Sequence, residues 1–151
     1  MDKQFDVLRA NRLLILKIID NYSLEQLNKI PKGFKNNIAG NVAHLLVTQQ
    51  LLCYKFSGLS LNIPDETVDR YSKGTAPKSD LTKQEFEQIK AQFLSITDKF
   101  EQDYKNDIFK TYLSYTTSAN VTLNSISDAI EFNNFHEGIH LGYILTLKKL
   151  V

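Results

Sequence analysis

The chain has 151 residues, the length of one domain with enough interior for a core of its own. Its 18 Lys and Arg against 17 Asp and Glu give a net charge of +1, which argues against a main role in binding nucleic acid or an anionic membrane. The single cysteine, Cys53, excludes an internal disulfide framework and paired-cysteine zinc or redox motifs.

The N-terminus carries charges at Asp2, Lys3 and Asp6, where a signal peptide needs an unbroken apolar run. No apolar run approaches the roughly 20 residues that span a bilayer. We therefore expect a soluble, cytoplasmic protein.

Helical periodicity dominates the first half of the chain. Apolar residues over 5–19 are spaced for one wide helical face. A serine–glutamine capping box predicts a short helix over 24–28. A second long helix is expected over 36–58, with an asparagine N-cap and a closing glycine. Residues 59–80 are expected to be irregular, with one or two helical turns in DETVDRY.

Two further long helices are predicted in the second half. A threonine–glutamate capping box opens one over 83–104. Residues 106–124 are rich in β-branched residues and tyrosine, which indicates a packed and locally extended connection. Ser125 and Asp128 form another cap pattern, and we expect the helix that follows to run to the C-terminus.

Four long amphipathic helices without a repeat or an alternating strand pattern predict an all-α fold, a four-helix bundle. The connections over 22–36 and 106–124 are both long. Crossing back along a bundle about 30 Å tall takes roughly ten extended residues. These lengths allow an up-up-down-down order, which we expect here.

Two of the three histidines, His136 and His140, are spaced i and i+4 in the last predicted helix. This spacing puts both rings on one side of the helix, where they can share a divalent metal. The alternative is a pair of hydrogen-bonded core histidines. Apolar neighbours such as Phe135 and Ile139 predict that this side of the helix faces the core. Burying two imidazoles there without hydrogen-bond partners would cost free energy, and a bound metal would offset that cost.

The same segment, HEGIH, matches the HExxH pattern of zinc peptidases, with Glu137 as the would-be general base. Common peptidases of this type take a third ligand from downstream, but no His, Asp, Glu or Cys follows His140. A third ligand must come from upstream, and His44 is the only other histidine. The peptidase interpretation is therefore rejected.

His44 belongs to a narrow polar strip along the second long helix, together with Asn37, Asn41 and Thr48. This strip predicts the polar wall of a metal pocket, with Asn41 or Thr48 in contact with a ligand or with the metal-binding histidines. The alternative is that Asn37 is only a helix cap and Thr48 an ordinary helix residue.

With these motifs the chain resembles the DinB-like family over its whole length, as a single domain, 1–151, and in particular a subgroup common in bacteria of the Bacteroidetes type. The resemblance rests on an arginine in the first helix, an NxxH motif in the second and a late HExxHxG motif. The matching residues are Arg12, Asn41, His44, His136, Glu137, His140 and Gly142.

The resemblance implies a four-helix bundle of up-up-down-down order, often a homodimer, with zinc or nickel bound by His44, His136 and His140. Family members include thiol-dependent S-transferases and isomerases that use bacillithiol or mycothiol, and some hydrolases. The family name refers to damage-inducible expression, which implies a link to stress response. The net charge of +1 gives DNA binding no support, and we expect no nucleic-acid partner.

Three neutral imidazoles leave a coordination position for water or substrate, as in catalytic sites. We therefore predict a metal-dependent transferase of the thiol S-transferase type or a hydrolase acting on a small molecule, with a low-molecular-weight thiol as a possible cofactor. Glu137 is the candidate catalytic residue, which would orient an imidazole or a water, although a surface glutamate is an alternative. Asn41 and Thr48 are expected to line the substrate pocket.

The alternative function is a non-catalytic module, either a metal-stabilised dimeric bundle or a stress-related ligand-binding protein. An enzyme predicts a site open to a pocket, whereas this module predicts a site closed by a fourth protein ligand or by packing. Cys53 is expected in the core. Arg9 and Arg12 are expected in surface salt bridges, with binding of an anionic substrate as the alternative.

Overall fold

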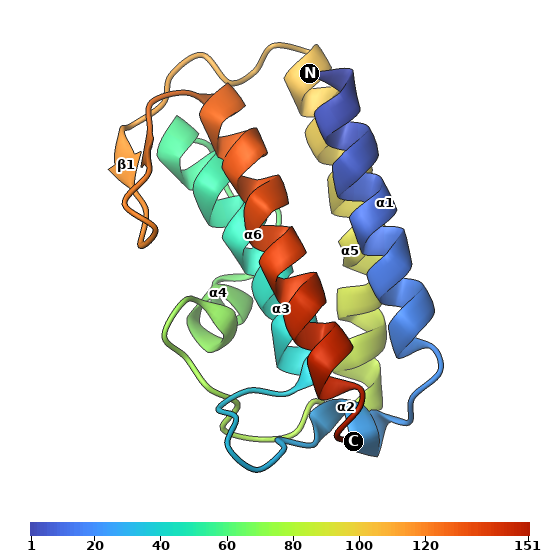
Figure 1. The fold of residues 1–151 in the computed structure, drawn as a ribbon. Coiled ribbons are helices and arrows are strands. Elements are labelled where there is room, and N and C mark those ends of the chain that lie inside the picture. Colours follow the sequence, from blue (N-terminus) through green and yellow to red (C-terminus); the bar gives the residue numbers. More distant parts are fainter.

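The computed structural model describes residues 1–151 and confirms the predicted all-α class, apart from one short hairpin (Figure 1). The elements are α1 (Asp2–Ile19), α2 (Leu24–Asn28), α3 (Ile38–Gln49), the π-helical turn η1 (Gln50–Tyr54), the 3₁₀ turn η2 (Lys55–Ser57), α4 (Asp65–Tyr71), α5 (Lys83–Lys105), β1 (Tyr115–Thr116), β2 (Thr122–Leu123) and α6 (Ile126–Leu147). No helix combines the length and the apolarity needed to cross a bilayer.

The predicted caps begin the helices as expected. Ser23, Asn37, Thr82 and Ser125 each accept a hydrogen bond from a backbone N–H in the first turn of α2, α3, α5 and α6 respectively. The predicted run of the last helix to the C-terminus is wrong, because α6 ends at Leu147. The backbone N–H groups of Lys149 and Leu150 bond three positions back, which tightens the last turn and ends the helix.

Contacts between the helices fix their directions. Gln4 near the start of α1 contacts Asn134 of α6. Further along α1, Arg12 contacts Glu137, which lies further along α6, so that α1 and α6 run parallel.

The two middle helices run the other way. Asn41 of α3 contacts His140, and the later His44 packs against the earlier His136, so that α3 is antiparallel to α6. The N-terminal half of α1 contacts the C-terminal half of α5, and its C-terminal end contacts Lys90, so that α5 is antiparallel to α1.

The long helices lie side by side, with α1 and α3 each packed against both α5 and α6 (Figure 1). The first and last long helices run in one direction and the two middle ones in the other, which differs from the predicted up-up-down-down order. The connections over 20–37 and 106–125 each stay at one end of the molecule, where they join α1 to α3 and α5 to α6. The chain instead crosses back along the molecule through residues 58–82, which include α4.

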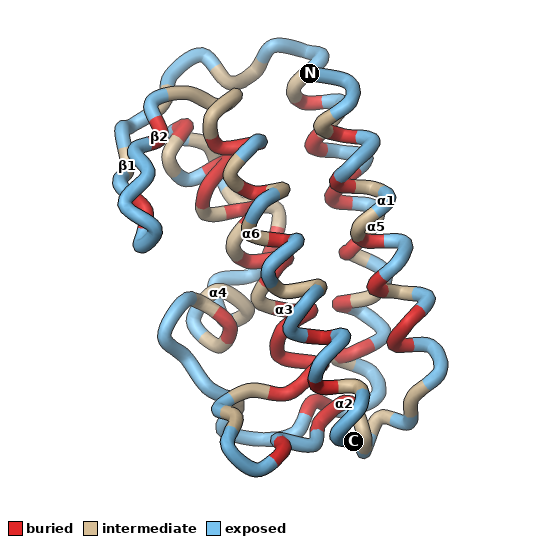
Figure 2. The backbone as a smooth tube through the Cα atoms, viewed as in Figure 1, coloured by how far each residue is buried: buried red, intermediate tan, exposed pale blue.

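Buried residues follow the inner sides of the long helices (Figure 2) and form two apolar clusters. The smaller cluster contains Leu8 and Leu52, and the larger contains Ile15 and Leu46. Along each long helix, buried polar side chains lie between the residues of one cluster and those of the other. We call these side chains the polar layer. Its members are Arg12, Gln49, Thr97, Asn133 and Glu137.

Candidate metal centre

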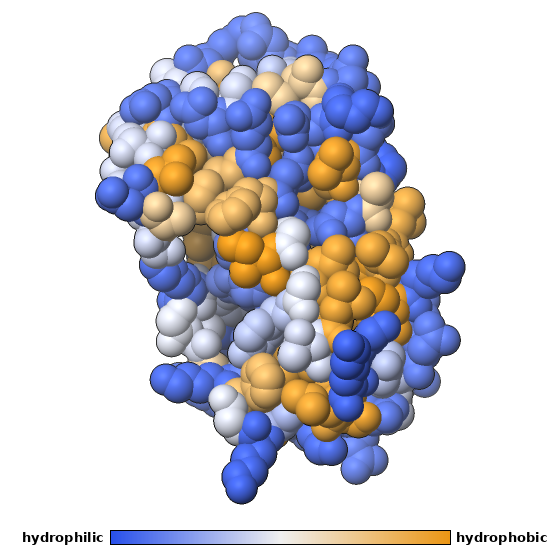
Figure 3. Space-filling model, viewed as in Figure 1, coloured by the Kyte–Doolittle hydropathy of each residue, from blue (hydrophilic) through white to orange (hydrophobic).

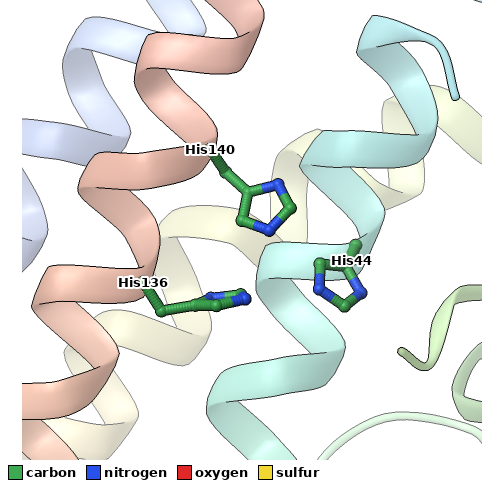
Figure 4. A group of neighbouring side chains, drawn as sticks. All are labelled: His44, His136 and His140. Atoms are coloured by element: carbon green, nitrogen blue, oxygen red, sulfur yellow. The ribbon is translucent and has the colours of Figure 1, made fainter. Parts of the chain in front are cut away.

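The three histidines of the chain meet between α3 and α6 (Figure 4). His44 comes from α3, and His136 and His140 come from successive turns of α6. Their ring centroids lie 4.5–5.2 Å apart, and each ring has a nitrogen within 4.8 Å of the others. No carboxylate or thiol joins this group.

Hydrogen bonds fix the protonated nitrogen of two rings. His44 Nδ1 lies 2.6 Å from the backbone oxygen of Tyr71, which only accepts, so Nδ1 carries the proton. Asn41 donates its amide to the oxygen of Asn37, so its own oxygen faces outward and accepts from His140 Nδ1 at 2.7 Å. In both rings Nε2 is therefore unprotonated and carries a lone pair, as in metal-ligating histidines that donate their other N–H to a carbonyl oxygen.

The third ring has an unsatisfied atom, because His136 Nδ1 is buried without a hydrogen-bond partner. A buried polar nitrogen left unpaired costs free energy, which a ligand at this point would recover.

All three rings are held in the uncharged form. Burial and the neighbouring rings lower the pKa of His136 to about 3, and burial lowers the pKa of His140 to about 4. Burial also lowers the pKa of His44, against the opposing effect of its bond to Tyr71. Neutral imidazole is the form that binds metals, so the donor set fits a divalent cation.

The two predicted pocket residues both contact histidines. The nearly buried Asn41 orients His140, as described above. The Thr48 hydroxyl lies 3.2 Å from His44 Nε2 and donates to it. Asn37 caps α3, as its alternative interpretation predicted.

Two cavities reach the histidines. A polar cavity of about 370 Å³ lies between α3, α6 and residues 70–77, and it is lined by all three rings. An apolar cleft of about 240 Å³ adjoins it and touches His44 and His136. The histidines are therefore reached from both a polar and an apolar space.

Glu137 does not face the three histidines. Its side chain is fully buried in the polar layer, where Arg12 donates to one carboxylate oxygen from Nε at 3.0 Å and from Nη2 at 2.7 Å. Asn11 and Asn133 donate to the same carboxylate. The structure thus assigns this glutamate to a buried ion pair, which differs from both the catalytic and the surface interpretations.

The burial of Arg12 is the main feature of the site that the sequence analysis did not predict. Arg12 is completely buried, and besides Glu137 it donates to the backbone oxygen of Phe93 and the hydroxyl of Thr97 on α5. The expected surface salt bridge is therefore wrong for Arg12 and correct for Arg9, which pairs with acidic residues on α5 at the surface. The only available signal was that Arg12 falls between Leu8 and Ile15 on the buried face of α1.

The remaining candidates are placed as follows. Cys53 is fully buried, and burial raises the pKa of its thiol, as expected for a core cysteine. Phe135 and Ile139 are 56% and 52% exposed, so the prediction that they face the core is wrong. Asn133 and Glu137 occupy the inward side of α6 in their place.

The comparisons with known proteins agree with this fold. A solved structure described as a conserved protein of a locus from Enterococcus faecalis matches with a TM-score of 0.69 and 10% sequence identity, over 99% of this chain and 95% of that one. This likeness concerns the fold alone. A comparison with curated proteins found no match. The family model of the DinB superfamily matches residues 8–144. The chain therefore belongs to the DinB superfamily.

Proposed function

We propose that this protein is a metal-dependent enzyme acting on a small molecule, with zinc or nickel held by His44, His136 and His140. The observation that carries the proposal is the convergence of three neutral rings from two helices at a point that two cavities reach. The orientation of two rings by hydrogen bonds at Nδ1 supports it further.

A divalent metal bound by three uncharged ligands keeps its full charge and supplies the Lewis acidity that ionises a water or a thiol near neutral pH. Either chemistry suits a hydrolase or a thiol S-transferase. The protein's own contribution is positional. The Tyr71 carbonyl and Asn41 hold two imidazoles by their N–H groups, and the Arg12–Glu137 pair ties α6 to α1 just beside His136.

The alternative, a non-catalytic metal-stabilised module, predicts a fourth protein ligand or a sealed site. The group contains three residues, all partly exposed, and the adjoining cavities favour the enzyme. Homodimer formation, a cytoplasmic location, a link to stress response and the subgroup stay predictions from the sequence.

The first test is elemental analysis of protein purified without a histidine tag. We expect about one divalent metal per chain, lost in His44→Ala and in His136→Ala. The control is Leu145→Ala, at an exposed apolar position on α6, which should retain the metal.

Activity is then tested with the metal-loaded protein. Displacement of chloride from 1-chloro-2,4-dinitrobenzene by a low-molecular-weight thiol tests the transferase, and hydrolysis of 4-nitrophenyl acetate tests the hydrolase. We expect one of these reactions to be accelerated by the native protein and not by His136→Ala. Absence of metal, or a metal-loaded protein that accelerates neither reaction, would contradict the proposal.

A further inference from the structure

The apolar cleft beside the histidines is lined by large aromatic and aliphatic side chains, which are uncommon on the solvent-facing side of a helix. Phe132, Phe135 and Ile139 project from α6, and Leu51 and Phe56 face them from η1 and η2. Two of these, Phe135 and Ile139, are more than half exposed. Figure 3 shows apolar side chains over α6 on this face, with a hollow beside them. An exposed apolar patch of this kind marks a binding surface.

The floor and rim of the cleft are built from separate elements. Tyr115 of the hairpin stacks on Phe56, with ring centroids 4.4 Å apart, and both residues line the cleft. His44 and His136 line it as well. A ligand in the cleft therefore lies directly against the histidine group.

The charged side chains that line the polar cavity and the apolar cleft are all positive. No Asp or Glu lines either the polar cavity or the apolar cleft, although the chain holds 17 such residues. Lys73 lines both spaces, Lys55 lines the cleft and Arg70 lines the polar cavity. Arg70 is paired with Glu85, whereas Lys55 and Lys73 are exposed and belong to no ion pair of the structure. Two cations without an ion-pair partner, in a cleft whose lining holds no carboxylate, favour an anionic ligand there. The carboxylates of Glu66 and Asp69 line a further cavity, which shares residues 74–77 with the polar cavity and no residue with the cleft.

We propose that the histidine site takes a small molecule with an apolar group beside an anionic group, and that the apolar group packs on Phe132, Phe135 and Ile139 while Lys73 faces the anion. This inference rests on the proposed function, because it takes the histidines as the reacting centre. A small ligand suits the cleft better than a second copy of the chain, since the cleft is a space of about 240 Å³ that His44 and His136 line.

The test compares three probes by isothermal titration calorimetry, with zinc present and after EDTA treatment. The probes are 4-phenylbutyrate, butyrate and 4-phenylbutylamine. We expect 4-phenylbutyrate to bind at least about tenfold more tightly than butyrate, because the ring is buried in the cleft. It should also bind more tightly than the amine, whose charge is reversed.

Matched variants locate the binding. Phe135→Ser should remove most of the advantage of 4-phenylbutyrate over butyrate, whereas Leu13→Ser, at a similarly exposed apolar position on α1, should not. Lys73→Gln should reduce the preference for the carboxylate over the amine, and Lys29→Gln, outside both cavities, should leave it unchanged.

The outcomes separate the two proposals. If zinc does not bind but 4-phenylbutyrate does, the proposed function fails and the ligand class stands. If zinc binds but the phenyl ring adds no affinity, or if Phe135→Ser has no effect, the ligand class is overturned. It is also overturned if sedimentation shows a dimer that Phe135→Ser dissociates and that excludes the probes.

Discussion

The candidate site depends on single hydrogen bonds that set which ring nitrogen is free. His140 of α6 is oriented by Asn41 of α3, and His44 of α3 is oriented by a backbone oxygen at the end of α4. Each ring is therefore held by a helix other than its own. The Asn41 contact was predictable, because Asn41 and His44 share one side of a helix. The Tyr71 contact was not, because a backbone oxygen leaves no residue-type signal in the sequence.

Replacement of Asn41 tests this orientation. Asn41→Ala removes the acceptor for His140 Nδ1, and we expect zinc affinity to fall about 10- to 100-fold. Asn41→Asp keeps an acceptor and should restore most of the affinity. Thr48→Val is the control, because the Thr48 hydroxyl bonds the very nitrogen that a metal would take. Competition with a fluorescent chelator measures all three, and equal affinities for Asn41→Ala and the native protein would exclude the role.

The buried ion pair gives a second prediction. Arg12→Met leaves Glu137 buried without its partner, which we expect to cost about 3–5 kcal/mol of unfolding free energy. The double variant Arg12→Met/Glu137→Met should be more stable than the single one, because no uncompensated charge remains. Arg9→Met breaks a surface pair and should cost about 0–1 kcal/mol.

Urea denaturation measures these differences. If Arg12→Met has the same unfolding free energy as Arg9→Met, the buried pair has no stabilising role. Zinc titration of the same variants shows whether the pair also positions α6, since Arg12→Met should then bind zinc more weakly than Arg9→Met does.

At the scale of whole elements, the sequence predicts helix starts well and helix faces less well. The caps of α2, α3, α5 and α6 were predictable because capping is a local interaction over three residues. The inward side of α6 was not, because apolar residues surround that helix and its periodicity does not select one face. Asn133 and Glu137 turn inward because Arg12, a residue of another helix, is buried opposite them.

The α5 cap carries a pH-dependent contribution. The bonds of Glu85 to Thr82, with its bond to Arg70, lower the pKa of Glu85 from its ordinary value of 4.5 to about 2. The ionised form is thus favoured by folding, and its contribution to stability is present above about pH 4.5 and is lost as the pH falls towards about 2.

Glu85→Gln keeps the cap bond and removes the charge. We expect the native protein to be more stable than this variant near neutral pH, with a difference that shrinks between about pH 4.5 and 2. Thr82→Ala should cost about 1 kcal/mol near neutral pH, because it removes the hydroxyl that accepts from the Glu85 backbone N–H. Thermal denaturation across the pH range checks both, and a pH-independent difference for Glu85→Gln would be inconsistent with the ion pair.

At the scale of the molecule, the arrangement of helices decides that the histidines meet. The antiparallel packing of α3 and α6 brings His44 level with His136 and His140. The sequence analysis named His44 as the third ligand because it is the only other histidine of the chain. The order of helix directions was not anticipated, because three connections are long enough to cross the molecule and length alone does not show which one does. The segment that crosses, 58–82, also supplies the Tyr71 carbonyl and one wall of the polar cavity.

The most direct test of the account is X-ray absorption spectroscopy of the tag-free, zinc-loaded protein. We predict a first shell that includes about three imidazole nitrogens at about 2.0–2.1 Å, with one imidazole fewer in His44→Ala. A spectrum with sulfur ligands, or one unchanged by His44→Ala, would show that these three rings do not share a metal.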